Sequence, residues 1–371
     1  MISYKVENTF FSNIYLALHH SFKTNHKVEF ICKDSEYDSL DWTKEPEESL
    51  EQLMLKHALD LRHRYERIIL GWSGGTDSHT IYKIFKKYKI HIDEILIKTS
   101  TRIAHQPKKN VDWIKKNHYD SSTIITEYDQ YDDFLKNLEC PNDEWIWNNK
   151  GNLLIFGVTT GGDTSQYLIE KNHSGKKYIY IAGYEKPYLI YKNKKWYARH
   201  LDKTLRGTMG YDYIDHFYLS PLINLKQNHL LKRATKELIT KNNLKLEDND
   251  TAEEKWGCND NNFGYQSYAS ASGRTEELNN GISFLQKIEY NKQFLLNLNV
   301  KKKYNNKLFK DKVLSDFLSN ENKTAINYIN GIYNLYSESK FIYKLHENKI
   351  INSRELICLP NIWSKTYNLG P

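Results

Sequence analysis

The order of apolar and polar residues predicts alternating strands and helices over the first part of the chain. Apolar runs of strand length stand at residues 67–72, 94–99, 123–128 and 178–182. Apolar residues recur at helical spacing at residues 47–67, 77–88, 110–117 and 131–138. Such alternation favours a parallel sheet covered by helices. We therefore predict an α/β fold, a Rossmann-like parallel sheet with helices on both faces.

The two flanks of this region have different patterns. Residues 1–45 carry short alternating stretches such as 27–31, and residues 188–199 have the pattern of a β-hairpin. The pattern turns helical from about residue 221 onward, at residues 222–239, 282–296 and 312–336. We predict a small N-terminal lead-in at 1–60, an α/β domain at 61–220 and a mainly helical C-terminal region at 221–371.

Composition narrows the class of protein. The chain has 371 residues, 39% of them hydrophobic, and 28 tyrosines help to build its core. No stretch reaches the ~20 apolar residues of a membrane span, and the first residues do not have the pattern of a signal peptide. We therefore expect a cytoplasmic protein without a membrane partner. Four widely spaced cysteines predict neither a zinc site nor a disulfide framework.

The charge balance is mildly basic. The chain carries 53 basic and 46 acidic side chains and a formal net charge of +7, which permits nucleic-acid binding without indicating it. The densest basic run, residues 301–307, contains Tyr304 as a stacking partner for a base. A solvated surface loop explains the same residues.

The run Ser73-Gly74-Gly75-Thr76-Asp77-Ser78 stands between the first predicted core strand and a predicted helix. Adjacent glycines let the backbone approach a ligand closely, so that successive N–H groups point at one anion. The helix adds its positive end, and the serine hydroxyls add donors. Asp77 repels phosphate unless a divalent cation lies between them, so Mg²⁺ is part of the prediction. An ordinary glycine-rich turn is the alternative.

This run resembles the S-G-G-x-D-S motif of the ATP pyrophosphatase, or PP-loop, superfamily, and matches neither the Walker P-loop nor the dinucleotide fingerprint. The resemblance implies ATP and Mg²⁺ as cofactors, cleavage between the α- and β-phosphates, and transfer of AMP to a substrate oxygen. It implies nucleotide binding by Ser73, Gly74, Gly75, Thr76, Asp77 and Ser78, with Asp77 also holding the metal. It further implies that adenine lies near the end of the second strand, at Lys98, Thr99 and Ser100.

Within the superfamily, the chain is most similar to the synthetase domain of asparagine synthetase. The similarity rests on the helical C-terminal half, on residues 220–226 leading into a helix, and on residues 182–186 after a late strand. A Gly-Glu-rich loop in those relatives implies nucleotide binding by Gly183 and metal binding by Glu185. Lysines must also neutralise the phosphates, and we select Lys186 and Lys226 as catalytic cations. Chance placement in a lysine-rich chain is the alternative.

One departure from these relatives concerns the source of nitrogen. They usually carry a glutaminase domain with an N-terminal cysteine, whereas this sequence starts Met1-Ile2. We expect free ammonia, an amine substrate or a separate ammonia-donating subunit to supply the nucleophile, and a homodimer is compatible with the sequence.

The resemblance implies an ATP-dependent, AMP-forming ligase that adenylates a carboxylate or amide oxygen of a small molecule and then forms an amide or related C–N bond. Two alternatives stay open. One is a PP-loop enzyme that modifies a tRNA or DNA base, and the other is a non-catalytic sensor of ATP or AMP.

Overall fold

The fold is described from a computed structural model. The described residues are 2–12, 17, 20–21, 24–72, 76–99, 107–129, 177–183, 188–200, 202, 212–241, 265–266 and 362–371. Within these ranges, no helix combines the length and the apolar character needed to cross a bilayer.

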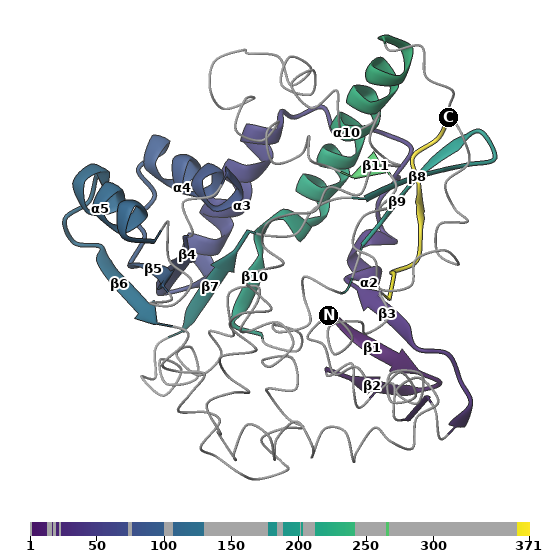
Figure 1. The fold of residues 1–371 in the computed structure, drawn as a ribbon, viewed down its shortest axis with the longest axis horizontal. Helices are drawn as coiled ribbons and strands as arrows, with labels where there is room; N and C mark the ends of the chain where they lie inside the picture. Colours follow the sequence, from purple (N-terminus) through teal and green to yellow (C-terminus); the bar gives the residue numbers. More distant parts are fainter. Residues whose placement is uncertain are drawn as a thin grey trace, which may run out of the picture.

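The largest sheet among the described residues is parallel and has five strands (Figure 1). Its strands are β4 (Arg67–Gly71), β5 (Glu94–Thr99), β6 (Ile124–Asp129), β7 (Tyr178–Ala182) and β10 (Ile214–His216). They lie in the order β10-β7-β4-β5-β6, and each neighbouring pair is parallel. Counted along the chain, this order is 3-2-1-4-5, as in doubly wound sheets. The predicted parallel α/β sheet is confirmed.

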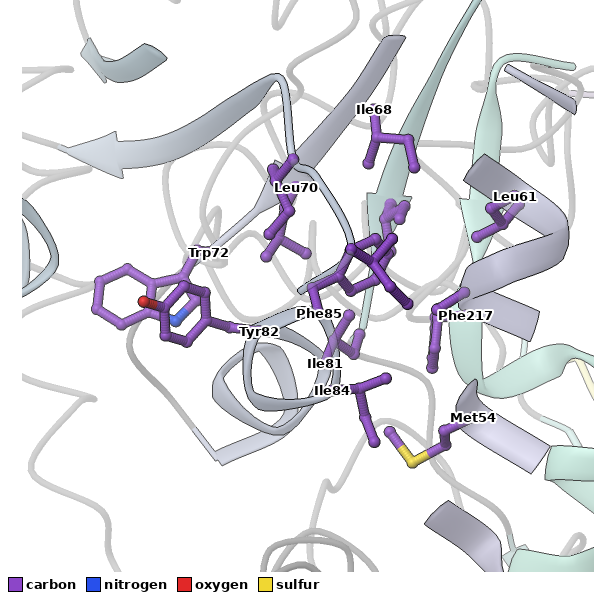
Figure 2. Packing of buried hydrophobic residues seen from close by; sticks show 14 of the residues in the cluster. Met54, Leu61, Ile68, Leu70, Trp72, Ile81, Tyr82, Ile84, Phe85 and Phe217 are labelled. Carbon is purple, nitrogen blue, oxygen red and sulfur yellow. The ribbon is translucent and has the colours of Figure 1, made fainter. Parts of the chain in front are cut away.

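One face of the sheet is covered by three helices, α3 (Leu50–Arg64), α4 (Thr76–Lys87) and α5 (Pro107–Asn117). Strand residues alternate, so Ile68 and Leu70 of β4 point into this core while Ile69 points to the opposite face. Figure 2 shows Ile68 and Leu70 against Phe85 of α4. Burying one such side chain contributes about 1.5–3 kcal/mol, so this packing fixes α4 on the sheet.

The opposite face is also buried. Tyr178 and Tyr180 of β7 are at most 4% exposed there. A Cβ atom on Gly71 would lie 2.1 Å from the Tyr180 hydroxyl oxygen, so the tyrosine needs a residue without a side chain at the end of β4. The chain connects β6 to β7 through residues 130–177. The helix predicted at 131–138 belongs to that connection and lies outside the described residues.

The helix boundaries follow from local capping. Helix α3 was predicted over 47–67 and begins later, because Ser49 and Gln52 form a capping box at its start. The Gln52 N–H donates to Ser49 Oγ at 3.2 Å, and the Ser49 N–H donates to Gln52 Oε1 at 2.8 Å. Helix α5 begins at Pro107, three residues before its predicted start, because proline suits the first helical position.

Two smaller antiparallel sheets lie on the β10 side of the parallel one (Figure 1). The first has the order β2-β1-β3, from β2 (Thr9–Phe11), β1 (Ile2–Val6) and β3 (Glu29–Cys32), with the short helix α2 (Asp34–Tyr37) after it. The second has the order β11-β8-β9-β12, from β11 (Tyr265–Gln266), β8 (Tyr188–Lys192), β9 (Lys195–Arg199) and β12 (Tyr367–Asn368). The predicted hairpin is β8-β9, and its turn residues Asn193 and Lys194 have φ angles of 49° and 61°.

The helical region predicted from residue 221 is described only at its start. Helix α10 (Pro221–Lys241) follows the 3₁₀ helix η4 (Phe217–Leu219) and packs against α3. The helices predicted at 282–296 and 312–336 lie outside the described residues. The domain boundaries stay a prediction. The first predicted boundary, at residue 60, falls inside helix α3, which packs on the parallel sheet.

Asp202 joins the last ten residues to the first strand. It is fully buried, accepts a hydrogen bond from the Tyr4 hydroxyl at 2.9 Å and accepts another from the Ile362 N–H at 3.0 Å. The Asp202 N–H in turn donates to the Ile362 carbonyl at 3.0 Å. The Arg199 guanidinium lies 3.7 Å from the ring centroid of Trp363. These contacts hold residues 362–371 against β9 and β1.

His200 lies in the same region, and its side chain is buried. Its side chain packs beside Tyr37, with ring centroids 5.2 Å apart, and neither ring nitrogen has a hydrogen-bond partner within the described ranges. Burial lowers the pKa of His200 to about 3. The imidazole is therefore neutral in the folded protein over the whole range in which a free histidine titrates.

We expect stability to fall in acid because of His200. Below pH ~6.5 the unfolded chain gains a proton that the folded chain does not take up until about pH 3, so stability present above 6.5 is lost as pH falls. Between pH 7.5 and 5.0 this loss amounts to about 2 kcal/mol. In urea unfolding at both pH values, the wild type should lose about 2 kcal/mol more than His200→Leu between pH 7.5 and 5.0. The exposed His63 provides the control, since His63→Gln should behave as the wild type; equal losses in all three would contradict this account.

Candidate functional site

The carboxyl ends of β4 and β7 lie side by side, because the two strands are adjacent and parallel. The strand order of the sheet reverses between them. Doubly wound sheets bind ligands at this switch point. Strand β4 continues into Trp72, whose N–H donates to the Leu96 carbonyl of β5 at 2.9 Å. Strand β7 continues into Gly183, which is buried. The chain segments that follow the two strands therefore start side by side.

Tyr218 of η4 connects these two segments. Its hydroxyl donates to the main-chain oxygen of Asp77 at 2.7 Å. Its ring lies 3.3 Å from the position that a Cβ atom on Gly183 would take, and Ile81 Cδ1 of α4 would lie 2.4 Å from the same atom. The chain thus passes very close to α4 at Gly183, directly after β7. The structure brings together two of the predicted site residues, Asp77 and Gly183, around a tyrosine that the sequence analysis missed.

Helix α4 begins at Thr76, and its first turn carries Asp77 and Ser78. The first N–H groups of a helix have no acceptor within the helix, and its dipole places positive charge at this end. The first turn therefore favours an anion at the switch point. Ser78 is 6% exposed and Thr80 is fully buried, so the helix starts inside the packed structure. Three predicted residues that precede the helix, Ser73, Gly74 and Gly75, lie outside the described residues.

The other predicted residues fall into two groups. Lys98 and Thr99 are the last residues of β5, next to β4 at the same edge of the sheet, and their backbones pair with Tyr128 and Asp129 of β6. The structure describes nothing of their side chains. Ser100, Glu185 and Lys186 lie outside the described residues.

The ammonium group of Lys226 is bound by two residues of the segment that precedes α3. It lies 2.7 Å from Glu45 Oε1 and donates to the Pro46 carbonyl at 3.0 Å. Glu45 also pairs with Arg233 of α10. Burial raises the pKa of Glu45, but these two cations outweigh it, so the pKa lies below its ordinary value. Lys226 would have to leave this ion pair to reach a phosphate, and its described contacts anchor α10.

A partly buried contact joins the middle of β10 to α3. His57 Nε2 of α3 lies 2.9 Å from Asp215 Oδ1, and both side chains are 12% exposed. Burial raises the pKa of Asp215, but the nearby His57 and Lys33 outweigh it, so the pKa lies below its ordinary value. The pair fixes the edge strand β10 to α3, three residues before Tyr218. The two partners are 158 residues apart, and no local sequence pattern predicts their contact.

Comparison of the chain with protein-family models and with curated protein sequences found no match. The class that the structure establishes is an α/β protein with a parallel five-stranded sheet.

Proposed function

We propose that this chain is an ATP-dependent, AMP-forming ligase of the PP-loop type. It adenylates a carboxylate or amide oxygen, releases pyrophosphate and forms a C–N bond with a nitrogen nucleophile. The observation that carries this proposal is the position of the motif at 73–78, between the central strand β4 and the first turn of α4, where the strand order reverses. The 3-2-1-4-5 strand order supports the finer assignment to a Rossmann-like nucleotide-binding fold.

The donor set at the start of α4 fits magnesium. Mg²⁺ is usually held by one or two carboxylates together with substrate phosphates and water. Asp77 supplies a partly exposed carboxylate in the first turn, and Glu185 after β7 is the proposed second ligand. Among the described residues, no group of three or more His, Cys, Asp or Glu side chains could hold a metal by itself. A site completed by the phosphates of ATP needs no such group.

The proposed roles follow from where charge develops. The substrate oxygen attacks the α-phosphorus, the bond to the bridging oxygen breaks, and pyrophosphate leaves with the electron pair. N–H groups of Gly74, Gly75 and the first turn of α4 would stabilise the leaving group, together with the Ser78 hydroxyl. Magnesium, when bound, supplies positive charge at the phosphates. The nitrogen nucleophile then attacks the carbon that bears the adenylated oxygen; the C–N bond forms, the C–O bond breaks, and AMP leaves with that oxygen. The backbone at Lys98 and Thr99 is the proposed contact to adenine.

Product analysis tests this proposal. The protein is incubated with ATP labelled at the α-phosphate and Mg²⁺, with separate pools of amino acids plus ammonium and of RNA, and AMP is resolved from ADP. We expect AMP and pyrophosphate in equal amounts, dependent on one of the pools. Formation of ADP alone would overturn the proposal. Binding of ATP without turnover in either pool would leave the sensor as the better explanation.

A nucleic-acid base oxygen is the second candidate for the adenylated group. An exposed tryptophan, Trp113 of α5, favours it, because this side chain is 39% exposed beside lysine-rich helices that flank the candidate site. AMP that forms only in the RNA pool would support the second candidate.

A further inference from the structure

An aromatic cluster lies between α4 and α5 and begins at the residue that precedes the motif. Trp72 is 3% exposed and Tyr82 is fully buried, and their ring centroids are 6.3 Å apart (Figure 2). Trp113 stacks on Trp72 with centroids 5.8 Å apart and an angle of 18° between the rings. His79 lies edge-on to Trp113 at 5.2 Å. The rings of the cluster thus hold Trp113 in place, while 39% of this residue stays exposed.

The same two helices carry an excess of positive charge. Helix α4 has three lysines and one acidic residue, Asp77, and α5 has four lysines and one acidic residue, Asp112. Several lysines share a face with the aromatic cluster: Lys83 and Lys86 follow His79 by four and seven residues, and Lys116 follows Trp113 by three.

Contacts confirm part of this arrangement. The Lys86 ammonium lies 5.9 Å from the ring centroid of Tyr82. Burial, and then the charges of Lys83 and Lys86, lower the pKa of His79.

The neighbouring lysines differ in their partners. Lys115 is paired with Glu127 at 2.7 Å, and Lys87 is paired with Glu51. Within the described ranges, Lys86 and Lys116 make no ion pair with a carboxylate. Lys86 donates instead to the Asn117 carbonyl at 3.1 Å, and Lys116 is exposed. Their charges are therefore available to an anionic partner beside Trp113.

We propose that this face of α4 and α5, defined by Trp113, Lys86 and Lys116, binds single-stranded nucleic acid. An unpaired base stacks on Trp113 and extends the stack of Trp113 on Trp72, while the two lysines contact phosphates. Aromatic side chains backed by cations are the common means of binding single strands, because every base offers a flat face. In a duplex, both faces of an internal base are already stacked, which disfavours double-stranded partners.

The geometry favours a polynucleotide over the adenine of ATP. His79 and Lys86 are seven residues apart, about 10 Å along α4, so the lysines extend away from the motif at the start of the helix. A strand with several phosphates can contact both the start of α4 and Lys86, whereas the phosphates of one ATP are assigned to the motif. The proposal concerns binding alone and does not depend on adenylation.

Fluorescence anisotropy with labelled single strands tests the proposal without ATP. The full chain is titrated against a twelve-nucleotide oligo(dT) and a matching oligo(U) at several salt concentrations, with duplex DNA, ATP alone and anionic phospholipid vesicles as separate arms. We expect the single strands to bind more tightly than the duplex. Trp113→Ala should weaken this binding at least about fivefold, and Trp113→Phe should weaken it less. Lys86→Gln and Lys116→Gln should each lower the salt slope by about one.

Matched control variants distinguish binding by this face from a general effect of removing a positive charge or an exposed aromatic side chain. Tyr88 is 38% exposed just beyond α4, but its hydroxyl donates to Glu51 Oε1 at 2.6 Å, so Tyr88→Ala serves as the aromatic control. Lys115→Gln is the lysine control. Both should stay within about twofold of the wild type. Equal weakening by Lys115→Gln and Lys116→Gln, no binding of either strand at low salt, or binding of vesicles or ATP alone through Trp113 would overturn the proposal. Circular dichroism checks that each variant is folded.

Discussion

Asp77→Asn is expected to lower the rate of AMP formation on the order of 100-fold, which is the usual effect of removing one group that stabilises charge in the transition state. The amide is neutral and binds Mg²⁺ more weakly than a carboxylate does. The variant should therefore also need more Mg²⁺ for half-maximal activity. Initial rates with α-labelled ATP over a Mg²⁺ titration measure both effects.

The hydrogen bond from Tyr218 should survive this substitution, because it goes to the main-chain oxygen of Asp77 and not to its carboxylate. Asp112→Asn is a suitable control, since Asp112 is an exposed aspartate of α5. It should keep the wild-type rate. A folded Asp77→Asn protein with more than half the wild-type rate, from a wild type that forms AMP, would exclude Asp77 as the metal ligand.

Asp202→Ala is expected to lower the free energy of unfolding by about 3–5 kcal/mol. The substitution removes a buried carboxylate that accepts hydrogen bonds from the Tyr4 hydroxyl and the Ile362 N–H. Loss of a buried acceptor costs about 1–3 kcal/mol for each donor that it served. Urea unfolding followed by circular dichroism measures the change.

Two milder substitutions at the same place check the reason for this loss. Tyr4→Phe removes one of the two donors, so we expect a smaller loss of about 1–2 kcal/mol. Asp202→Asn keeps an oxygen acceptor and should fall between Tyr4→Phe and Asp202→Ala. Losses below about 0.5 kcal/mol, as at ordinary surface positions, would show that Asp202 does not join the two ends of the chain.

The sequence alone was sufficient to predict the central part of the sheet. Strands β4 and β7 are apolar runs flanked by polar residues, and an apolar run with such flanks stays buried whatever its neighbours are. The start of α4 was also predictable, because adjacent glycines followed by Asp77 end a strand and begin a helix. These signals are local in the chain.

The rest of the fold and of the candidate site depends on contacts between residues that are far apart in the sequence. Strand β10 has three residues, Ile214–His216, and two of them are polar, so no periodic pattern indicates it. It is held by pairing with β7 and by the contact of Asp215 with His57. Tyr218 meets Asp77 across 141 residues. Lys226 shows the same limit for the candidate site, since its place near a motif does not reveal its ion pair with Glu45.

The hydrogen bonds of Asp202 affect the order in which parts of the chain fold during synthesis. Domains generally fold from the N-terminus as the chain emerges from the ribosome. Here the first strand, through Tyr4, shares Asp202 with Ile362, and β12 completes the edge of β9. A nascent chain that has not yet released residues 362–369 therefore cannot complete either contact. Until these residues have emerged, the edge of β9 that β12 covers is exposed, and a chaperone can bind there.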